Sequence, residues 1–325
     1  MNHRKGHKNT CIPNRDRGSA LVVTLLIIAT LTGLAVAFSD DSSTELSLAG
    51  FSRDGYRAYL TARSGVHFAM ALLDNEENKE MDSYREDWAK FEMAPVLSEL
   101  SQDVTFTGKI VDENGKFNLN SLVNEKGEIV DLAYLQLLRL FSTLGIDEKL
   151  IPPLLDWLDK DDIERLDGAE NYYYQNRQGP YPCANGPFLT IGQVFLVKGF
   201  REVEKFGEKG KKRLLDFMTI SSDGKININT APREVLQSLS DKLDGAVADG
   251  IIEYRQEEDF FRIDDLKKVT GISDEVFNEI KDRITVKSSA FSIEAQGHCQ
   301  EAEAHINAIV KRESGRLKLV YWRVI

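Results

Sequence analysis

The chain has 325 residues, of which 29% are charged and 42% hydrophobic, and its formal net charge at pH 7 is −11. This length is enough for one large domain or two to three ordinary ones. The acidic balance argues against nonspecific attraction of the protein to nucleic acid or to an anionic lipid surface.

The amino-terminal stretch joins a basic leader to an apolar segment. The leader, residues 1–18, is rich in lysine and arginine and ends at Gly18. An uncharged apolar run from Ala20 to Phe38 follows, close to the roughly 20 residues that cross a bilayer core. The positive charge before the run predicts that the amino end stays on the cytoplasmic side. Everything after Asp40 is then delivered across the membrane.

Three interpretations of this stretch remain open. It is a cleaved secretory signal, with 35–37 as a small-x-small site, or a permanent signal anchor, or a leader cut before the apolar run. The third is favoured because Gly18 abuts the run and because the helical pattern continues past the polar patch at 39–45. Apolar residues recur there at steps of three and four, interrupted once by Arg53: Leu46, Ala49, Tyr56, Tyr59, Ala62, Val66, Ala69 and Leu73. We therefore predict a stem helix over 19–75.

The rest of the chain predicts an α+β fold. Alternating patterns predict strands at 103–112, 116–120, 285–293, 304–311 and 316–325, with a hairpin turn at Asn114-Gly115 between the first two. An antiparallel sheet packed on the stem helix makes the head, from residues 76–119 and 284–325. Residues 120–283 are predicted to be a large helical insertion into that head.

An internal repeat divides the insertion into two related helical units, 120–223 and 224–283. Gly115–Ser121 is echoed by Gly224–Thr230, and Phe188 is echoed by Phe260. Helices are predicted at 132–143 and 150–158 in one unit, and at 233–239 and 246–254 in the other.

The second unit resembles the helix-hairpin-helix module of exported DNA-binding proteins. That module binds phosphate through backbone N–H groups at its hairpins. Here the hairpins, 243–245 and 271–275, each lack one glycine and place acid where phosphate would lie. The sequence therefore predicts this fold without nucleic-acid binding.

An acidic loop between Trp157 and Phe188 is present in the first unit only. Six acids crowd its first part: Asp159, Asp161, Asp162, Glu164, Asp167 and Glu170. Carboxylate oxygens on a flexible loop suit Ca²⁺, although the glycine and glutamate of a calcium hand are misplaced. The composition alone fits a calcium site or a solvated acidic loop.

The remaining polar residues indicate no catalysis. No Ser/His/Asp order, His-x-x-x-His spacing or phosphate loop occurs, and His298 and Cys299 would point to opposite faces of a strand. We therefore expect no catalytic residues and no enzyme. Cys183 and Cys299, in an oxidising compartment, can form one disulfide or remain two buried thiols.

The leader and stem resemble those of type IV pilin-like proteins. The resemblance implies that prepilin peptidase cleaves after Gly18 and that the new amino terminus, Ser19, is methylated. Pilins usually carry glutamate at the fifth mature position, where this chain has Val23. Its absence fits a subunit with no predecessor, at the tip of a filament, and fits an ordinary membrane anchor equally well.

Nearly the whole chain resembles the general secretion pathway protein K family, the minor pseudopilins K of type II secretion. The resemblance rests on Asn-Leu-Asn at 118–120, Asn-Ile-Asn-Thr-Ala at 227–231, Asp-Trp-Leu-Asp-x-Asp at 156–161 and Gly-Ala-Glu at 168–170. It implies a tip subunit that initiates pseudopilus assembly for protein export across the outer membrane. The implied partners are minor pseudopilins I and J, then H and the major pseudopilin G. The implied location is the bacterial inner membrane, crossed once, with the head in the periplasm.

The same resemblance implies calcium in the helical domain. By matching position, Asp159, Asp161 and Glu170 are the expected ligands, with Asp162 a further candidate. Two alternatives are kept beside this interpretation. One is a membrane-anchored periplasmic helix-hairpin-helix protein that binds nucleic acid, which a gel shift at low salt would reveal. The other is an anchored, calcium-stabilised adhesin.

Overall fold

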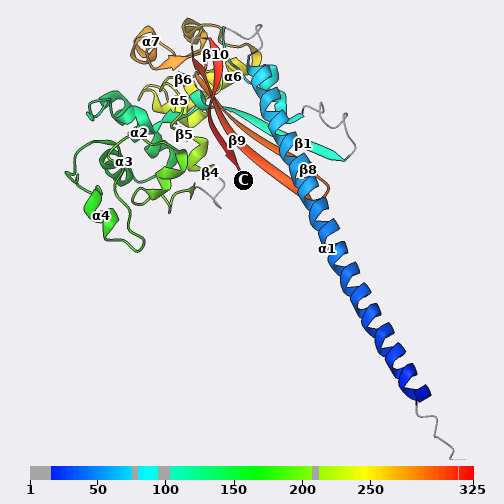
Figure 1. Cartoon of the computed structure of the whole chain (residues 1–325). Helices are drawn as coiled ribbons and strands as arrows, with labels where there is room; N and C mark the ends of the chain where they lie inside the picture. Colours follow the sequence, from blue (N-terminus) through cyan, green and yellow to red (C-terminus); the bar gives the residue numbers. More distant parts are fainter. Residues whose placement is uncertain (1–15, 75–79, 94–102, 207–211, 314) are drawn as a thin grey trace, which may run out of the picture. The chain divides into compact units, whose positions relative to one another are not determined.

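The computed structural model describes residues 16–74, 80–93, 103–206, 212–313 and 315–325, so most of the leader lies outside the described residues. The chain divides into two units, Met1–Tyr56 and Arg57–Ile325. A single helix, α1 (Asp16–Leu73), makes up the described part of the first unit and continues into the second (Figure 1). The predicted stem helix is thereby confirmed.

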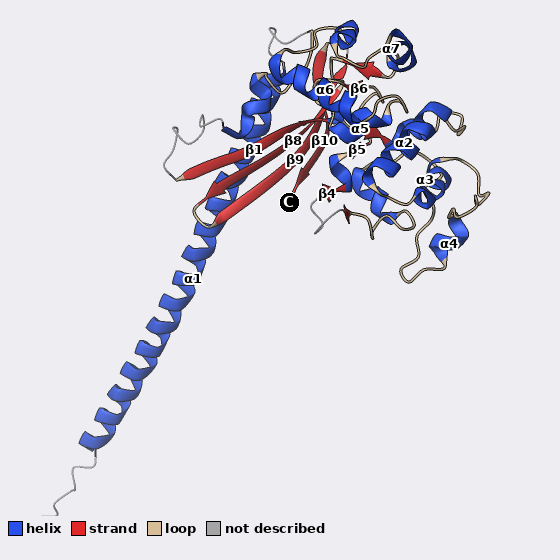
Figure 2. Ribbon diagram, turned by 180° about the vertical axis from the view of Figure 1, so that it is seen from behind, coloured by secondary structure: helices blue, strands red, loops and turns tan. Residues whose placement is uncertain are grey.

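The head is built on a four-stranded antiparallel sheet of order β1-β8-β9-β10 (Figure 2). Its strands are β1 (Val104–Asp112), β8 (Ala290–Cys299), β9 (Ala302–Glu313) and β10 (Arg316–Val324). Side chains alternate between two faces, as in any strand. Phe291 and Ile293 of β8 are buried, for example, whereas Glu294 beside them is exposed. The predicted combination of a long amino-terminal helix and a carboxyl-terminal antiparallel sheet is confirmed.

Small side chains let the carboxyl part of α1 lie close to this sheet. A buried row at helical spacing faces the strands: Ala58, Ala62, Val66, Ala69 and Leu73. Gly297 of β8 is required at this contact, because a Cβ there would lie 2.2 Å from the Ala58 carbonyl oxygen. Trp88 and Phe91, from a 3-10 helix over Asp87–Met93, complete the same apolar core.

The helical insertion runs between β1 and β8 along the chain. The first unit contains β2 (Phe117–Asn118), α2 (Asp131–Leu144), α3 (Ile151–Leu158), α4 (Asn171–Gln175), β3 (Lys205–Phe206), β4 (Lys212–Arg213) and β5 (Met218–Thr219). The second contains β6 (Ile226–Asn227), α5 (Arg233–Ser238), α6 (Gly245–Glu257), α7 (Asp274–Ile280) and β7 (Ile284–Thr285). Each unit is closed by a short parallel pair, β2 with β5 and β6 with β7.

The repeat is confirmed by hydrogen bonds as well as by topology. In the first unit Asn120 Nδ2 donates to the Phe188 carbonyl (3.0 Å) and Asn120 Oδ1 accepts from the Phe188 N–H (2.8 Å). In the second, Asn229 makes the same two bonds to Phe260, at 2.9 and 3.0 Å. In each unit, therefore, an equivalent asparagine side chain holds the equivalent distant loop.

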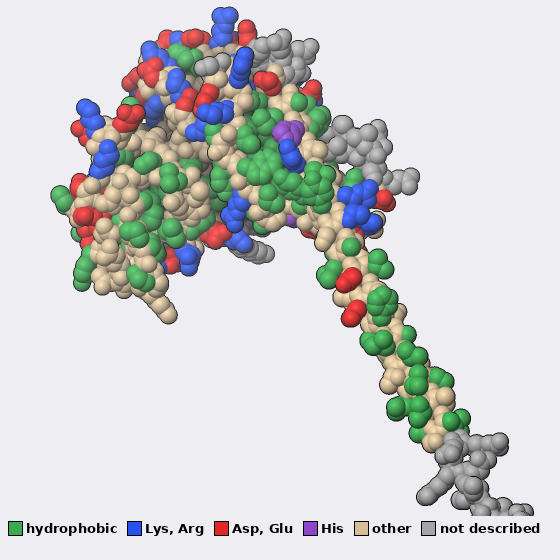
Figure 3. All heavy atoms as spheres, in the orientation of Figure 1, with side chains coloured by type: hydrophobic (Ala, Val, Ile, Leu, Met, Phe, Trp, Pro, Cys, Tyr) green, Lys and Arg blue, Asp and Glu red, His purple; other side chains and the backbone are tan. Residues whose placement is uncertain are grey.

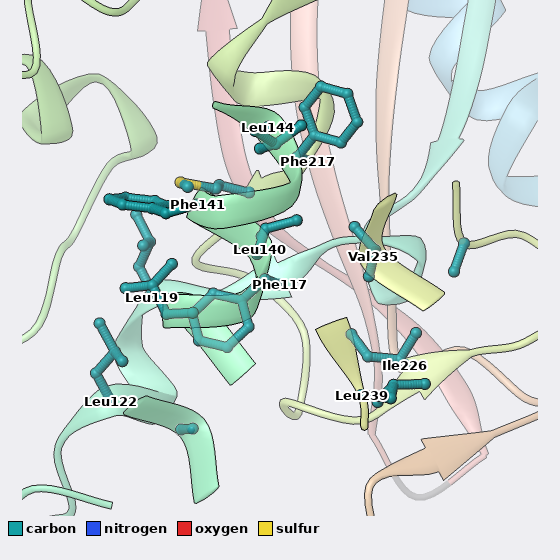
Figure 4. Packing of buried hydrophobic residues seen from close by; sticks show 14 of the residues in the cluster. Phe117, Leu119, Leu122, Leu140, Phe141, Leu144, Phe217, Ile226, Val235 and Leu239 are labelled. Atoms are coloured by element: carbon teal, nitrogen blue, oxygen red, sulfur yellow. The ribbon is translucent and has the colours of Figure 1, made fainter. Parts of the chain in front are cut away.

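The two units share one hydrophobic core rather than two (Figure 4). Phe117, Leu119 and Leu140 of the first unit lie in the same cluster as Ile226 and Val235 of the second. This core also takes in residues that the sequence assigned to the head, at 117–119 and at 284–286. The insertion therefore begins directly after β1 and ends directly before β8, wider on both sides than predicted.

A buried polar network joins the insertion to the head. Asp112, at the end of β1, accepts hydrogen bonds from Ser288 Oγ (2.6 Å) and Asn227 Nδ2 (2.9 Å). Next to it, Arg312 of β9 pairs with both carboxylate oxygens of Asp82, at 2.5 and 2.7 Å. Desolvation raises the pKa of Asp112 to about 6, despite the hydrogen bonds that favour its charged form.

The predicted hairpin at Asn114-Gly115 is wrong. β1 pairs with β8 and β2 pairs with β5, and the residues between β1 and β2 form a 3-10 turn, Glu113–Gly115. The Asn114 side chain is fully buried and bonds the Lys225 carbonyl (2.9 Å) and the Ser289 N–H (2.8 Å). It therefore ties the entry of the insertion to its exit.

The disulfide between Cys183 and Cys299 does not form in this structure. Both are free, buried thiols. Cys183 belongs to the core of the insertion, whereas Cys299, on β8, packs with Ala58 and Ala304 in the head. Because the two lie in separate cores, the alternative of two buried thiols holds.

Candidate functional site

Three buried carboxylates converge in the first helical unit: Asp156, Asp159 and Glu170. One oxygen of each lies within 4.8 Å of one oxygen of each of the others. The three residues are 0, 1 and 3% exposed. Burying like charges this closely is unfavourable unless a cation accompanies them, so the cluster is a candidate metal centre.

Local structure explains how the three meet. Asp156 lies on α3, and Asp159 follows three residues later as the residue that ends that helix, so both project from one side. The chain then loops back, and the Ala169 N–H donates to Asp156 Oδ2 at 2.8 Å. Gly168 makes this return possible, because a Cβ there would lie 1.9 Å from the same oxygen. Glu170 is thereby brought beside the two aspartates.

One cation of the chain itself already reaches the cluster. Arg165 Nη1 pairs with Asp156 Oδ1 at 2.6 Å and with Asp159 Oδ2. The guanidinium neutralises one of three potential negative charges. The remaining charge would match a divalent ion when all three carboxyls are ionised.

Several oxygens of the cluster remain without hydrogen-bond donors. Within the described residues, neither Glu170 oxygen accepts a hydrogen bond from nitrogen or hydroxyl, and neither does Asp159 Oδ1. Burial, then Asp156 and Asp159, raise the pKa of Glu170 to about 7. The neighbouring Cys183 thiol has a pKa raised to about 12 by burial, so it stays protonated. Carboxylate oxygens are the donors that Ca²⁺ prefers.

The predicted ligands are only partly brought together. Asp159 and Glu170 lie in the cluster, whereas Asp161 and Asp162 lie outside it. Asp161 caps a turn by accepting from the Ile163 N–H (2.8 Å), and Asp162 accepts from Asn185 Nδ2 (3.1 Å).

Sequence reasoning missed one member of the cluster. Asp156 belongs to it, and its signal was the i, i+3 spacing from Asp159 at the end of a helix. Asn185 lies across the loop and donates to Asp162, outside the cluster.

The stem carries the second functional feature. α1 is long and apolar enough over Ser19–Leu73 to cross a membrane, and none of its most apolar window is buried inside the protein. Figure 3 shows hydrophobic side chains covering the lower part of this helix. Leu34 and Phe38, for example, are 71 and 74% exposed. Such a surface is stable in lipid or against other helices, but not in water.

The helix-hairpin-helix unit presents acids at both of its hairpins. Lys242, before α6, pairs with Glu275 at 2.6 Å, and Lys267 pairs with Asp274 at 2.9 Å. Both acids lie in the first turn of α7. These two lysines are therefore already matched by carboxylates of the same unit.

An apolar stem helix that continues onto a four-stranded antiparallel sheet defines a pilin-like subunit, here enlarged by a helical insertion. A family model described as type II secretion system (T2SS), protein K, matches residues 115–205. Type II secretion system protein K of Pseudomonas aeruginosa is 29% identical over 266 residues, 78% of this chain and 76% of its own. That of Pectobacterium carotovorum is 23% identical over 94% of this chain and 96% of its own.

A solved structure shares this fold. The crystal structure of the GspK-GspI-GspJ complex from enterotoxigenic Escherichia coli contains a chain with a TM-score of 0.63 and 19% identity. The match covers 88% of this chain and 99% of that one. The family model, the curated relatives and the fold together support type II secretion protein K, a minor pseudopilin, as the family that this chain resembles.

The second helical unit has relatives of its own. A helix-hairpin-helix model matches residues 221–285. ComE operon protein 1 of Bacillus subtilis is 43% identical over 74 residues, 21% of this chain and 36% of its own. The predicted helix-hairpin-helix resemblance is thereby confirmed at the level of the motif.

Proposed function

We propose that the chain caps the tip of the type II secretion pseudopilus and initiates its assembly for protein export across the outer membrane. The observation that carries this is the size of the helical insertion between β1 and β8. In a filament whose stems pack side by side, each head needs room for the next head above it. A head enlarged in this way leaves none, so the subunit can occupy only the end of the filament.

Processing of the leader is part of the same proposal. Prepilin peptidase cuts after Gly18, and the methylated amino terminus is Ser19. The apolar run then remains on the mature protein and anchors it in the inner membrane, with the head in the periplasm. Intact mass of the membrane-extracted protein tests this. Loss of residues 1–18 plus one methyl group is expected, and an intact leader or loss of 1–37 would contradict it.

The tip position is tested by labelling. Pseudopili overproduced with an epitope in the insertion should carry the label at one end only. A strain lacking the protein should lose export of its secreted proteins and regain it with the full chain. Label along the whole filament would contradict a tip position. Normal export in the deletion strain would contradict the initiating role.

The partners follow from this position. The related protein of enterotoxigenic Escherichia coli forms a GspK-GspI-GspJ complex. By extension we propose that minor pseudopilins I and J bind this chain directly. Pseudopilin H and the major pseudopilin G then extend the filament below them. Association of the stems within the membrane relies on van der Waals packing of apolar helices.

We further propose that the acidic cluster holds a structural calcium ion. Asp156, Asp159 and Glu170 would supply carboxylate oxygens. A bound ion would offset the repulsion among the buried acids and so stabilise the loop between α3 and α4. Thermal melting with calcium and with chelator should differ by several degrees. Equal melting temperatures would contradict the site.

The helix-hairpin-helix match favours one other function, nucleic-acid binding by an anchored periplasmic protein. The internal pairs at Lys242 and Lys267 speak against it. A gel shift at low salt is therefore expected to show no complex, and a salt-sensitive shift would support the alternative.

A further inference from the structure

The arginine that reaches the acidic cluster is not held like a permanent ion pair. Arg165 Nη1 serves two carboxylates at once, because it pairs with Asp156 Oδ1 at 2.6 Å and with Asp159 Oδ2. An arginine fitted to one carboxylate frequently makes two parallel bonds to it, from two different nitrogens. In the cluster one nitrogen makes both pairs, and each pair goes to a different acid.

The head contains the contrasting case. Arg312 binds Asp82 through two nitrogens, at 2.5 and 2.7 Å, and also donates to the Ser288 carbonyl at 2.9 Å. The side chain of Arg312 is 14% exposed, whereas that of Arg165 is 30% exposed. The acids that the two arginines bind are fully buried in both places. Arg165 therefore reaches its partners from the surface, and its guanidinium has a path back to water.

The position of the Arg165 nitrogen is that of a bound cation. Ca²⁺ lies roughly 2.3–2.6 Å from its oxygen ligands, and Nη1 lies 2.6 Å from Asp156 Oδ1. The nitrogen thus stands in for an ion between two of the three proposed carboxylate ligands. An ion bound to the same two oxygens would overlap with it, and the two positive charges would repel each other. The guanidinium and such an ion therefore exclude each other.

The loop that carries Arg165 allows the side chain to leave while the backbone stays. Ile163 and Leu166, on either side of it, are 75 and 89% exposed, so their packing does little to hold this segment over the cluster. The Arg165 carbonyl accepts from the Gly168 N–H at 2.8 Å, which fixes the turn that leads to Glu170. Rotation about side-chain bonds is therefore enough to move the guanidinium outward.

We propose that Arg165 is a built-in competitor of calcium at the acidic cluster. Its guanidinium balances Asp156 and Asp159 when calcium is scarce, and it turns out to the surface when the ion binds. Three carboxylates around a divalent ion leave one negative charge over, which the arginine can still balance from the rim of the site. This role of Arg165 rests on the proposed calcium site and adds a threshold to it, because free calcium must displace the arginine before it can stabilise the loop between α3 and α4.

Calcium titration calorimetry of the full chain in detergent tests the competition. R165M removes the charge and brings no oxygen. The matched control is R177M, because Arg177 belongs to the same unit but lies over the Tyr173 ring, 5.4 Å from its centroid. R165M should lower the calcium dissociation constant by about tenfold or more, since a like charge leaves the site, and R177M should leave it unchanged.

The possible results separate the competition from the calcium site itself. An unchanged or higher dissociation constant for R165M, in protein that melts cooperatively, would overturn the role of Arg165 and leave the calcium site standing. Absence of calcium binding by the wild type and by both variants would contradict the calcium site of the proposed function.

A second measurement needs no variant. Phenylglyoxal modifies accessible guanidinium groups, and mass spectrometry reports the modification of each arginine separately. In the wild-type chain, calcium should raise the modification rate of Arg165 severalfold over the rate in chelator, while the rate of Arg177 stays constant. A rate for Arg165 that falls or does not change, in protein that calorimetry shows to have bound calcium, would overturn the displacement.

Discussion

Replacing Glu170 by glutamine is expected to stabilise the calcium-free protein and to weaken its response to calcium. The side chain is 3% exposed, and neither of its oxygens has a hydrogen-bond donor among the described nitrogens and hydroxyls. Without a metal ion the folded protein therefore favours the neutral acid. Glutamine keeps the shape of that neutral acid and carries no charge at any pH.

The magnitude follows from the pKa. Burial beside two aspartates raises the pKa of Glu170 from 4.5 to about 7. At about 1.4 kcal/mol per pH unit, ionising this group costs the folded state up to about 3 kcal/mol. Below pH 4.5 the group is neutral in both states and there is no penalty. Stability is lost as the pH rises from 4.5 to 7, and the full loss remains above 7.

The assay is urea or thermal unfolding at pH 4.5 and pH 8, with chelator and with calcium. With chelator, E170Q should exceed the wild type by up to about 3 kcal/mol at pH 8, roughly 6–12 °C, and match it at pH 4.5. With calcium, the stability difference between E170Q and the wild type should shrink or change sign, because the variant lacks one proposed ligand. E301Q, at an exposed turn, is the control and should not change either comparison. A variant E170Q that is less stable with chelator, or that gains as much from calcium as the wild type, would refute the reasoning.

Two further predictions concern the framework. G297V should destabilise the head by about 1–3 kcal/mol or more in urea unfolding. The new side chain would meet the Ala58 carbonyl and other backbone atoms of α1, which cannot move aside. Unchanged stability would mean that α1 does not pack there. N229A should cost about 2–4 kcal/mol, since it leaves the buried N–H and C=O of Phe260 unpaired. The matched variant N120A, at a less buried position, should cost less, and equal or reversed losses would contradict the argument from burial.

Periodicity and repetition predicted much of this fold. The apolar row ending at Ala62, Val66, Ala69 and Leu73 identified the face of α1 that packs on the sheet, because burial imposes helical spacing on a surface helix. The repeated asparagines were recognisable before their role was known. In both units the same two hydrogen bonds explain why the side chain must be asparagine.

The prediction of a hairpin at Asn114-Gly115 was wrong because the same two residues can serve either a hairpin turn or long-range hydrogen bonds. Asn-Gly is a strong turn signal. Here the asparagine serves distant groups, Lys225 and Ser289, and the strands beside it pair elsewhere. Nothing in a local pattern distinguishes these two uses of a buried asparagine.

The membership of the acidic cluster was predictable only in part. Asp159 and Glu170 stood out in a dense run of acids, but so did Asp161, which caps its own loop. Asp156 was predicted to lie in a helix, and it does, but its side chain also belongs to the buried cluster. Which acids of a loop converge depends on how the chain returns, here through Gly168, and spacing alone does not encode that return.

The buried tie between Asn114 and Ser289 has a topological consequence. The ends of β1 and β8 are neighbours, since Asp112 pairs with Phe291, so the entire helical domain occupies the place of a hairpin loop. A chain shortened there to a few turn residues would keep its strand order and register. A pilin-like head without the helical domain would therefore differ from this one by a single deletion, with the sheet beneath it unchanged.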